Sequence, residues 1–592
     1  MSAVDREPIT LVEIDVDGCS LTFGSAPCTA ALGVVTRRKC YNTFATCRDV
    51  ANYARTATHR TLRFAEARSN LPKGATIFPV IEGVSEYSAT VNIAGSDSDL
   101  SALGRRATVR VSLIDFPYHD RLTDPYQAER VNGTAQNDEA GYDPGARGTF
   151  FGKLKSRWPH YAGRPLRVIN AFLDGGAIVN PTTRHYVITE MTGPDDNGAV
   201  TFDAADVLDL AKNDKAVAPR ASTGSLSANI TDVAGSLTLV PAGVGNAEYP
   251  ASGRALIGSE IVGYTRSGDV VTLTARGVAR TTAASHSAGD TFQQVLRFEN
   301  VRMDDAIRTL LVDYAGINAA FIPTATWADE IDRWMPDVLL NGHIVKPTGV
   351  STLVGELAVL GVSIWWDAAT QLIGLKTSRP PSTDPVFDLT DEANIKAISQ
   401  EDRDDKRLTQ VHFLSVVSDP SKSTTSKENF DRLYVTPDLT AESANAFNGQ
   451  RIREIFCRWL DQGANDLIRV LSQRLLARFV TAPAHFEITL DAKDTAISLT
   501  DVLRVGSRIV MDETGKPATR LLQVIERSEP RSGHEIRLVA QAYQFDLRYA
   551  VIGPNTLDVY GAESEDNKAD YAFIGADTLP AFPDGTDYYR IV

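Results

Sequence analysis

Short runs in which apolar and polar residues alternate recur along the 592-residue chain. Residues 9–16, 61–64, 87–93 and 108–114 follow this period of two, and Gly, Asp, Asn and Pro stand between the runs. A period of two turns one side of a strand toward a core and the other toward solvent. The pattern predicts a mainly β fold with only a few helices.

Helical spacing is confined to a few places. Three segments carry the 3.6-residue apolar period of a helix: 303–314, 352–360 and 464–479. For the second helix, Ser351 is a candidate N-cap and Gly361 a candidate stop. The apolar runs 362–366 and 372–375 then predict a strand hairpin packed under that helix.

Length and charge limit the class of protein. At about 100–200 residues per domain, the chain has room for roughly three to six domains. Its 75 acidic and 60 basic residues give a net charge of −15, which argues against a general nucleic-acid binder and suits a surface that DNA passes without adhering. We find no signal peptide and no apolar run long enough to cross a membrane, and we expect a protein made in a cytoplasm.

Two stretches have the composition of linkers, residues 213–227 and 418–428. Between residues 227 and 294 the sequence predicts a compact set of short strands, at 237–240, 254–262 and 270–274. We interpret this segment as a small β domain inserted into a larger one.

The chain contains one internal repeat. Residues 181–204 and 517–540 align without a gap at a shift of 336 residues. Just upstream, residues 166–168 match 503–505 at a shift of 337, which requires a one-residue insertion or deletion. Val200 and Phe202 face Ile536 and Leu538, so the strand alternation stays in phase. Six positions are identical: Pro181, Thr183, Arg184, Glu190, Pro194 and Ala204 face Pro517, Thr519, Arg520, Glu526, Pro530 and Ala540. The repeat predicts two related hairpins; the alternative is two unrelated hairpins of similar composition.

Four of the five cysteines crowd together. Cys19, Cys28, Cys40 and Cys47 lie within 29 residues, whereas Cys457 stands alone. Zinc sites usually present paired thiolates from a tight knuckle, and this spacing has none. Well-spaced cysteines of a folded loop can reach the separate irons of an iron–sulfur cluster. The spacing therefore favours such a cluster over zinc, while two disulfides or four reduced thiols remain open.

No catalytic constellation emerges from the sequence. It has no paired-histidine zinc motif, no serine-nucleophile elbow and no P-loop, and we expect no enzyme. We interpret His160 and His185 as structural and Cys457 as a buried thiol. Residues 401–405 could suggest a calcium loop but lack its glycine and final glutamate, so we expect a solvated turn.

Four tryptophans remain to be placed. Trp327, Trp334, Trp365 and Trp366 could form a platform for stacking sugars. Because they belong to the predicted helix and hairpin unit, we expect them in the core instead.

The motifs around the cysteines resemble the beginning of hub proteins from siphophage tails. They are residues 23–30, 39–49 and 61–64. Within the predicted insertion, residues 249–253, 257–260, 264–268 and 286–290 resemble a module of the same proteins. The end of the chain, through the second repeat unit, is similar to their tube-like barrel, and related gene-transfer particles carry similar hubs.

The resemblance implies a structural role at the distal tip of a virion tail. It implies a homotrimer with two tube-like β-barrels per chain, with a distal tail protein, tail-tip or fibre proteins and a tape-measure protein as partners, and with DNA passing through without specific binding. Because tail tubes are built from hexameric rings, three chains with two related barrels would present six similar surfaces. The resemblance also implies a 4Fe-4S cluster on Cys19, Cys28, Cys40 and Cys47.

The predicted domain plan combines these observations: 1–221, a first barrel carrying the cysteine loop (17–64); 222–298, the inserted domain; 299–395, a helix and hairpin domain; 396–550, a helix and second barrel; 551–592, an extension. Two other functions stay open. One is a tail-associated cell-wall hydrolase, which requires an acid/base or Cys-His pair that the sequence does not show. The other is an iron–sulfur redox protein, for which no dinucleotide fingerprint is present.

Overall fold

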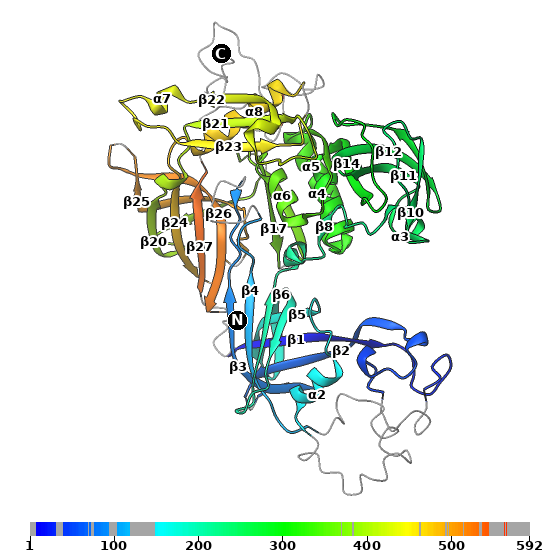
Figure 1. The fold of residues 1–592 in the computed structure, drawn as a ribbon. Helices are drawn as coiled ribbons and strands as arrows, with labels where there is room; N and C mark the ends of the chain where they lie inside the picture. The colour runs from blue at the N-terminus through cyan, green and yellow to red at the C-terminus, as the bar shows by residue number, and fades with distance from the viewer. Residues whose placement is uncertain are drawn as a thin grey trace.

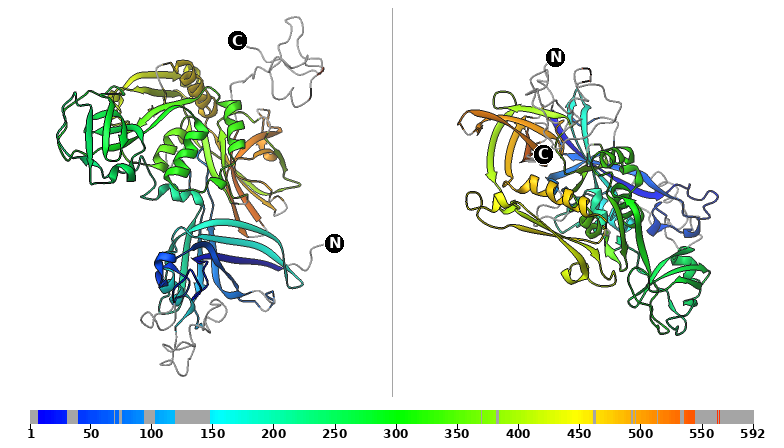
Figure 2. Two further views of the ribbon diagram at one scale, coloured as in Figure 1. Left: turned by 90° about the vertical axis from the view of Figure 1, so that its right-hand side faces the viewer. Right: turned by 90° about the horizontal axis from the view of Figure 1, so that it is seen from above.

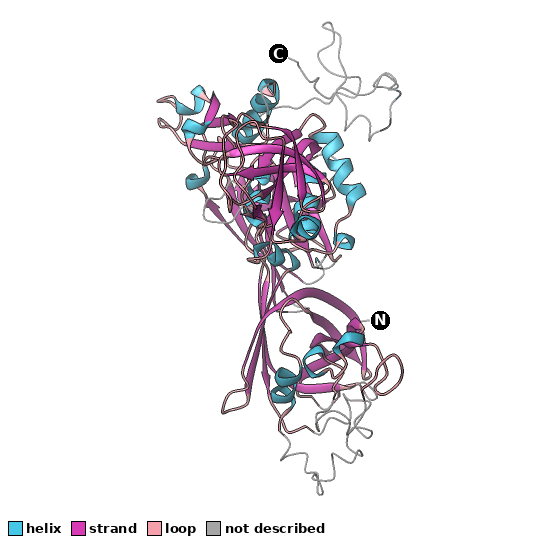
Figure 3. Ribbon diagram, turned by 45° about the vertical axis from the view of Figure 1, so that its right-hand side comes forward, coloured by secondary structure: helices cyan, strands magenta, loops and turns pink. Residues whose placement is uncertain are grey.

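The chain forms two lobes joined by long strands (Figure 1). The computed structural model describes residues 7–30, 40–68, 70–72, 76–93, 103–118, 148–368, 370–381, 384–460, 463–491, 494, 496–512, 514–531, 535–543, 562 and 564. The predicted extension 551–592 therefore lies outside the described residues apart from Ala562 and Ser564. Strands dominate both lobes, as the alternation predicted (Figure 3).

The lower lobe is a closed seven-stranded barrel in the order β1-β2-β3-β4-β7-β6-β5. Its strands are β1 (Glu7–Cys19), β2 (Arg55–Glu66), β3 (Ile77–Tyr87), β4 (Thr108–Ile114), β5 (Pro165–Asp174), β6 (Ala177–Thr192) and β7 (Ala199–Ala205). Along β1, Val12, Ile14 and Val16 point into the barrel core. The short helix α2 (Phe150–Arg157) adds Phe150 and Phe151 to that core. Closure leaves this sheet no free edge.

The second sheet resembles the barrel but stays open. Its order is β19-β25-β26-β27-β24-β20. The strands are β19 (Val386–Thr390), β20 (Ile395–Asp402), β24 (Ala484–Asp491), β25 (Val502–Met511), β26 (Pro517–Arg531) and β27 (Glu535–Ala542). Only residues 391–394 separate the two edge strands β19 and β20, so the sheet has to curl. Since no ladder joins those strands among the described residues, the predicted second closed barrel is not observed.

Helices pack between the sheets in the upper lobe. They are α4 (Met303–Thr309), continued by a π-helical turn (Leu310–Tyr314), α5 (Thr324–Trp334), α6 (Val350–Ala358) and α8 (Asn465–Phe479). Below α6 lies the predicted hairpin of β17 (Val362–Asp367) and β18 (Leu372–Thr377). Trp327, Trp334 and Trp366 are buried, and the Trp327 indole donates to the Ile373 carbonyl at 2.8 Å. The core interpretation is confirmed for these three tryptophans.

The inserted segment stands at the side of the upper lobe (Figure 2) and has its own core. Its elements are β9 (Ser225–Leu226), β10 (Ser236–Val240), α3 (Val244–Glu248), β11 (Ser252–Ile257), β12 (Glu260–Ser267), β13 (Val270–Ala275) and β14 (Gln293–Arg302). Its sheet continues through β14 to β15 (Leu339–Ile344), beyond residue 298. The single strand predicted at 254–262 is wrong, because Gly258 turns the chain at a φ of +58° and splits it into β11 and β12.

A three-stranded sheet lies at the end of the upper lobe, in the order β22-β21-β23. Its strands are β21 (Gln410–Val417), β22 (Phe430–Pro437) and β23 (Ile452–Cys457). The short helix α7 (Leu439–Glu442) lies between β22 and β23 in the chain. A 3-10 turn, Asp404–Lys406, precedes the sheet, and its exposed Asp404 and Asp405 pair with neighbouring arginines. The predicted solvated turn at 401–405 is therefore correct for 403–405 and wrong for Glu401 and Asp402, which are the last residues of β20.

Three other predictions need correction. The run 87–93 is not a strand of the barrel, because β3 ends at Tyr87 and the following residues cross to β26. The segment 213–227 is more than a linker, since β8 (Val217–Ala218) pairs with β16 (Thr348–Gly349) over a buried Ala218. The N-cap of α6 is Gly349 and not Ser351. In the part of the chain that the structure describes, no helix is long and apolar enough to cross a membrane.

Candidate functional site

The cysteine loop is held at one end of the barrel, between β1 and β2. Cys19 is the last residue of β1, and its amide donates to the Asn42 carbonyl at 2.6 Å. A Cβ on Gly18 would lie 2.8 Å from that carbonyl oxygen, so the close approach requires glycine. Asn42 itself adopts a φ of +61°, and its Nδ2 donates back to the Cys19 carbonyl at 3.4 Å. These contacts place Cys19 beside the segment that begins with Cys40.

A second set of hydrogen bonds joins the segments that carry Cys28 and Cys47. The amide and hydroxyl of Thr29 donate to Asp49 Oδ2 at 2.8 and 3.0 Å. Thr29 follows Cys28, and Asp49 lies two residues after Cys47. Hydrogen bonds from Thr29 and from Asn52 hold the pKa of Asp49 below its usual value, so this carboxylate is charged at neutral pH. The loop therefore brings the four cysteine segments together in two hydrogen-bonded pairs.

Two of the four sulfurs accept hydrogen bonds from backbone amides. The amides of Asn42 and Asp49, each two residues after a cysteine, donate to the Sγ atoms of Cys40 and Cys47 at 3.4 Å. Burial raises the pKa of the Cys47 thiol, and neighbouring Cys19 and Cys28 raise it further.

Whether the cysteines are free or paired bears on the choice between an iron–sulfur cluster, zinc, two disulfides and four reduced thiols. All five cysteines are free thiols in the structure, with no disulfide among them. Within the described ranges, no three His, Cys, Asp or Glu side chains converge closely enough to hold a metal ion. The donor set itself suits an iron–sulfur cluster, because it offers four thiols and backbone donors to two of the sulfurs. The identity of the cofactor stays a prediction.

A row of carboxylates lies on the outer side of β1, at the base of the loop. Glu13, Asp15 and Asp17 alternate with the core residues and are buried under cationic side chains. Arg167 donates to Glu13 at 2.9 Å and to Asp15 at 2.6 and 2.8 Å. The Trp158 indole donates to Asp17 at 2.6 Å. Burial alone would raise the pKa of Asp15 and Asp17, but these hydrogen bonds hold it below the usual value, so both aspartates are ionised at neutral pH.

The two predicted repeats form hairpins of identical register. β6–β7 and β26–β27 each pair antiparallel, and each lies between equivalent strands, β4 and β5 in the barrel and β24 and β25 in the second sheet. Equivalent residues pair as follows: Leu166↔Tyr186 with Leu503↔Leu522, Val168↔Arg184 with Val505↔Arg520, Ile188↔Ala204 with Val524↔Ala540, and Met191↔Phe202 with Arg527↔Leu538. Even the bulge recurs, before Glu190 and before Glu526. The shared register confirms the predicted repeat.

The barrel contacts the second sheet at the second bulge. Ser88, Thr90 and Arg105, on the connection between β3 and β4, donate to Glu526 at 2.5, 2.8 and 2.7 Å. The Val91 amide donates to the Ile525 carbonyl at 2.8 Å, and Thr90 forms an isolated antiparallel bridge with Glu526, beyond the part of β26 that pairs with β25. We call this contact the Glu526 junction.

A buried ion pair reinforces the junction from the barrel. The Arg184 guanidinium bridges Glu86 of β3 and Glu529 of β26, and its side chain is 12% exposed. Although burial opposes the charge of Arg184, the two carboxylates raise its pKa above the usual value. Tyr186 donates to the same Glu86 at 3.1 Å. Three strands of two different sheets therefore meet at one arginine.

The other predicted residues occupy structural positions. Burial lowers the pKa of His185, which lies beside Arg167, and its carbonyl accepts from the Trp366 indole at 3.2 Å. His160 contacts the Phe44 ring, with the ring centroids 6.4 Å apart. Cys457 is buried at the end of β23, and burial raises its pKa to about 12, so it is a protonated thiol.

The Glu526 junction was not predicted from the sequence, although a signal for it was present. Glu190 and Glu526 are identical residues in the repeat, and both are polar positions in strands of alternating pattern. Ser88 and Thr90 gave no signal of their own, because residues 87–93 were assigned to a strand, and Arg105 lies between the predicted strands 87–93 and 108–114. Only the fold shows which carboxylate they reach.

Comparison with known proteins gives the following similarities. No family model matches the sequence, and no curated protein matches it. The tail protein from Neisseria meningitidis MC58 is 11% identical, with a TM-score of 0.32, over 78% of this chain and 96% of that chain. The 43 kDa tail protein of prophage MuSo2 from Shewanella oneidensis is 11% identical, with a TM-score of 0.33 and the same coverage. A chain from the virion of a native gene transfer agent is 12% identical, with a TM-score of 0.27, over 56% of this chain and 87% of that chain. These similar structures are of the kinds that the sequence motifs resemble, phage tails and gene-transfer particles.

Proposed function

We propose that the chain is a structural hub at the distal end of a phage-type tail, where three copies close the tail tube. The observation that carries this proposal is the duplicated hairpin, with the same neighbours and the same bulge in two sheets of one chain. Three chains would present six such hairpins to a hexameric ring, which resolves the mismatch between threefold and sixfold symmetry. In this role the chain acts by assembly and not by catalysis.

The proposed partners follow from this position. The ring of six hairpins would contact a distal tail protein. The lobe of each chain that lies farther from the tail tube would contact tail-tip or fibre proteins. A tape-measure protein and then DNA would pass through the lumen. The net charge of −15 suits that passage, because an acidic wall repels phosphates.

The cysteine loop has a structural role in this proposal. We propose that Cys19, Cys28, Cys40 and Cys47 ligate a 4Fe-4S cluster that fixes a loop with little apolar core of its own, with zinc the weaker alternative. Free thiols, backbone donors to Cys40 and Cys47, and the pairing through Asn42 and Asp49 support this assignment. Bound at this place, the cluster would supply cross-linking of the loop and no redox step.

The repeat also supplies a model for the contact between chains. Within one chain, Glu526 accepts from the connection between β3 and β4 of the barrel. The equivalent residue of the barrel, Glu190, is exposed. The equivalent connection follows β20 and carries Arg403, Lys406 and Arg407 within residues 402–407. Asp402, Asp404 and Asp405 balance these three cations within the segment. If domains alternate around a ring, this segment of one chain reaches Glu190 of the next and can offer it an arginine or lysine partner.

Reversing the charge at Glu190 tests the proposed assembly. In native mass spectrometry, the unmodified full chain is expected to give a trimer. Glu190→Lys is expected to weaken it at least tenfold, because it replaces the carboxylate that would pair with a cation of residues 402–407 by a group of the same charge as that cation. Asp232→Lys, on an exposed residue of the inserted domain, is the matched control and should remain trimeric. A monomer for the unmodified chain at the concentrations of assembly would contradict the proposed function.

A further inference from the structure

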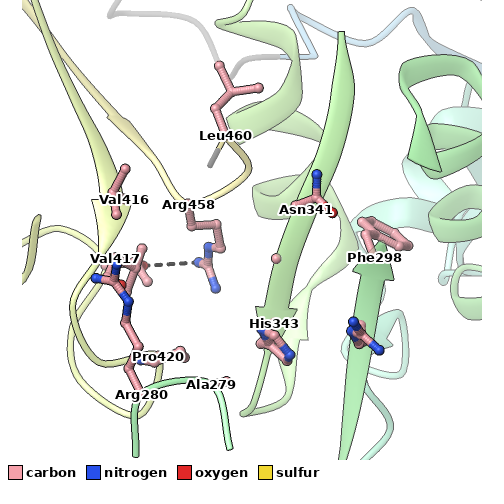
Figure 4. Close-up of a pocket in the computed structure, with 13 residues that line it drawn as sticks. Ala279, Arg280, Phe298, Asn341, His343, Val416, Val417, Pro420, Arg458 and Leu460 are labelled. Carbon is pink, nitrogen blue, oxygen red and sulfur yellow. Dashed lines mark hydrogen bonds between the residues drawn. The ribbon is translucent and has the colours of Figure 1, made fainter. Parts of the chain in front are cut away.

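A cavity of about 440 Å³ lies between the inserted segment and the three-stranded sheet (Figure 4). Its wall is shared by three parts of the fold. Arg280 comes from the loop after β13, Arg297 and His343 come from the paired strands β14 and β15, and Arg458 follows β23. The volume falls within the range of about 300–1,000 Å³ that is typical of small-ligand sites.

The cavity is lined by cations and by no carboxylate among the described residues that form its wall. Arg458 uses Nε and Nη2 to hold Glu356 at 2.9 and 2.7 Å, and its side chain is directed into the space between Val417 and His343 (Figure 4). Arg280 donates to the Val417 carbonyl at 3.4 Å and pairs with Asp431. Arg297 pairs with Glu299. None of the three carboxylate partners, Glu299, Glu356 and Asp431, is among the residues that line the cavity, whereas the arginines are.

A further guanidinium lies behind His343. Arg254 of β11 contacts the Nε2 atom of His343, so this nitrogen accepts and the imidazole is neutral. Burial, together with the charges of Arg254 and Arg297, lowers the pKa of His343 to about 4. Burial and the neighbouring Arg297 also lower the pKa of Arg254. The like charges repel one another here, and a bound anion would relieve that repulsion.

We propose that this cavity binds a phosphate group, either free or carried on a small sugar. Arg280, Arg297 and Arg458 approach from different elements and therefore from different sides. A tetrahedral oxyanion accepts hydrogen bonds from several directions at once, whereas a planar carboxylate is matched by one guanidinium in its own plane. The site is independent of the proposed role in assembly, and it would give the inserted segment a ligand.

Calorimetric titration of the full chain with inorganic phosphate and with glucose 6-phosphate tests the site. Saturable binding of both with similar affinity identifies free phosphate as the ligand, and tighter binding of the sugar phosphate identifies the carried group. Arg297→Gln is expected to weaken binding at least tenfold, because it removes one charge-assisted hydrogen bond. Arg469→Gln, on the exposed side of α8, is the control and should bind like the unmodified chain.

A second measurement separates loss of the site from loss of the fold. Proton resonances of His343 should show its pKa rising from about 4 when phosphate is bound, and this rise should be absent in Arg297→Gln at an unchanged melting temperature. Failure of both ligands to bind at millimolar concentration would overturn the proposal. Equal affinities of Arg297→Gln and the unmodified chain would overturn it as well.

Discussion

Replacing Cys40 with serine is expected to remove iron and inorganic sulfide from protein purified without oxygen, together with the broad visible absorbance of a cluster. Cys40 is buried, and its sulfur accepts a hydrogen bond from the Asn42 amide. The Asn42 carbonyl in turn accepts a hydrogen bond from the Cys19 amide. A serine hydroxyl is a poor ligand for iron, and ligand binding contributes its free energy to the folding of the loop. Hydrogen exchange in residues 17–64 should therefore become faster.

Cys457→Ala is the matched control for the cysteine experiment. Cys457 is also buried, but it lies at the end of β23 in the upper lobe, and burial raises its pKa to about 12. Its replacement should leave the iron content unchanged. A disulfide between any two of Cys19, Cys28, Cys40 and Cys47 in freshly made protein would contradict the cluster, and so would iron retained in full by Cys40→Ser.

Replacing Arg184 with alanine is expected to destabilise the contact between the two lobes by about 3 kcal/mol, because it leaves two partly buried carboxylates with one cation fewer. Those carboxylates, Glu86 and Glu529, come from β3 and β26. The expected results are a lower melting temperature and faster proteolysis within residues 88–93, which cross from one lobe to the other.

Arg520→Ala is the control, because Arg520 is the equivalent of Arg184 in the second hairpin. Arg520 pairs with Val505 as Arg184 pairs with Val168, yet it is not part of the Glu526 junction. Its loss should cost less than about 0.5 kcal/mol, as is usual for surface substitutions. Equal effects of the two replacements would show that the junction contributes no specific stability.

The barrel was predictable wherever the alternation of residues reflects burial. Val12, Ile14 and Val16 face the core, and Glu13, Asp15 and Asp17 face the other side, so a period of two was enough to place β1. The repeat was predictable for the same reason: its identical residues keep one register in both sheets. Local patterns were sufficient where local burial decides the structure.

Local patterns were misleading where contacts between distant segments determine the structure of a segment. The run 87–93 alternates like a barrel strand, but Thr90 and Val91 pair with β26, more than 400 residues away. Closure of the second sheet depends on whether β19 and β20 pair, and no ladder joins these strands among the described residues. At α6, Ser351 suggested the N-cap, yet the helix begins two residues earlier, after Gly349.

The candidate site was predictable in its residue types and not in its connections. Crowding indicated that the four cysteines act together, and the structure adds the bonds through Asn42 and through Thr29 and Asp49. Nothing in the sequence marked Ser88, Thr90 and Arg105 as donors to Glu526, because their partner lies in another sheet. Sequence spacing carries no information about such contacts until the fold is known.

The most direct test of the proposed hub is an electron-microscopy structure of the particle that contains this chain. It should show three copies at the distal end of a tail tube, with β6–β7 and β26–β27 alternating around the axis as six similar hairpins below a hexameric ring. Finding one or two copies of the chain, or the two hairpins at different distances from the axis, would contradict the account.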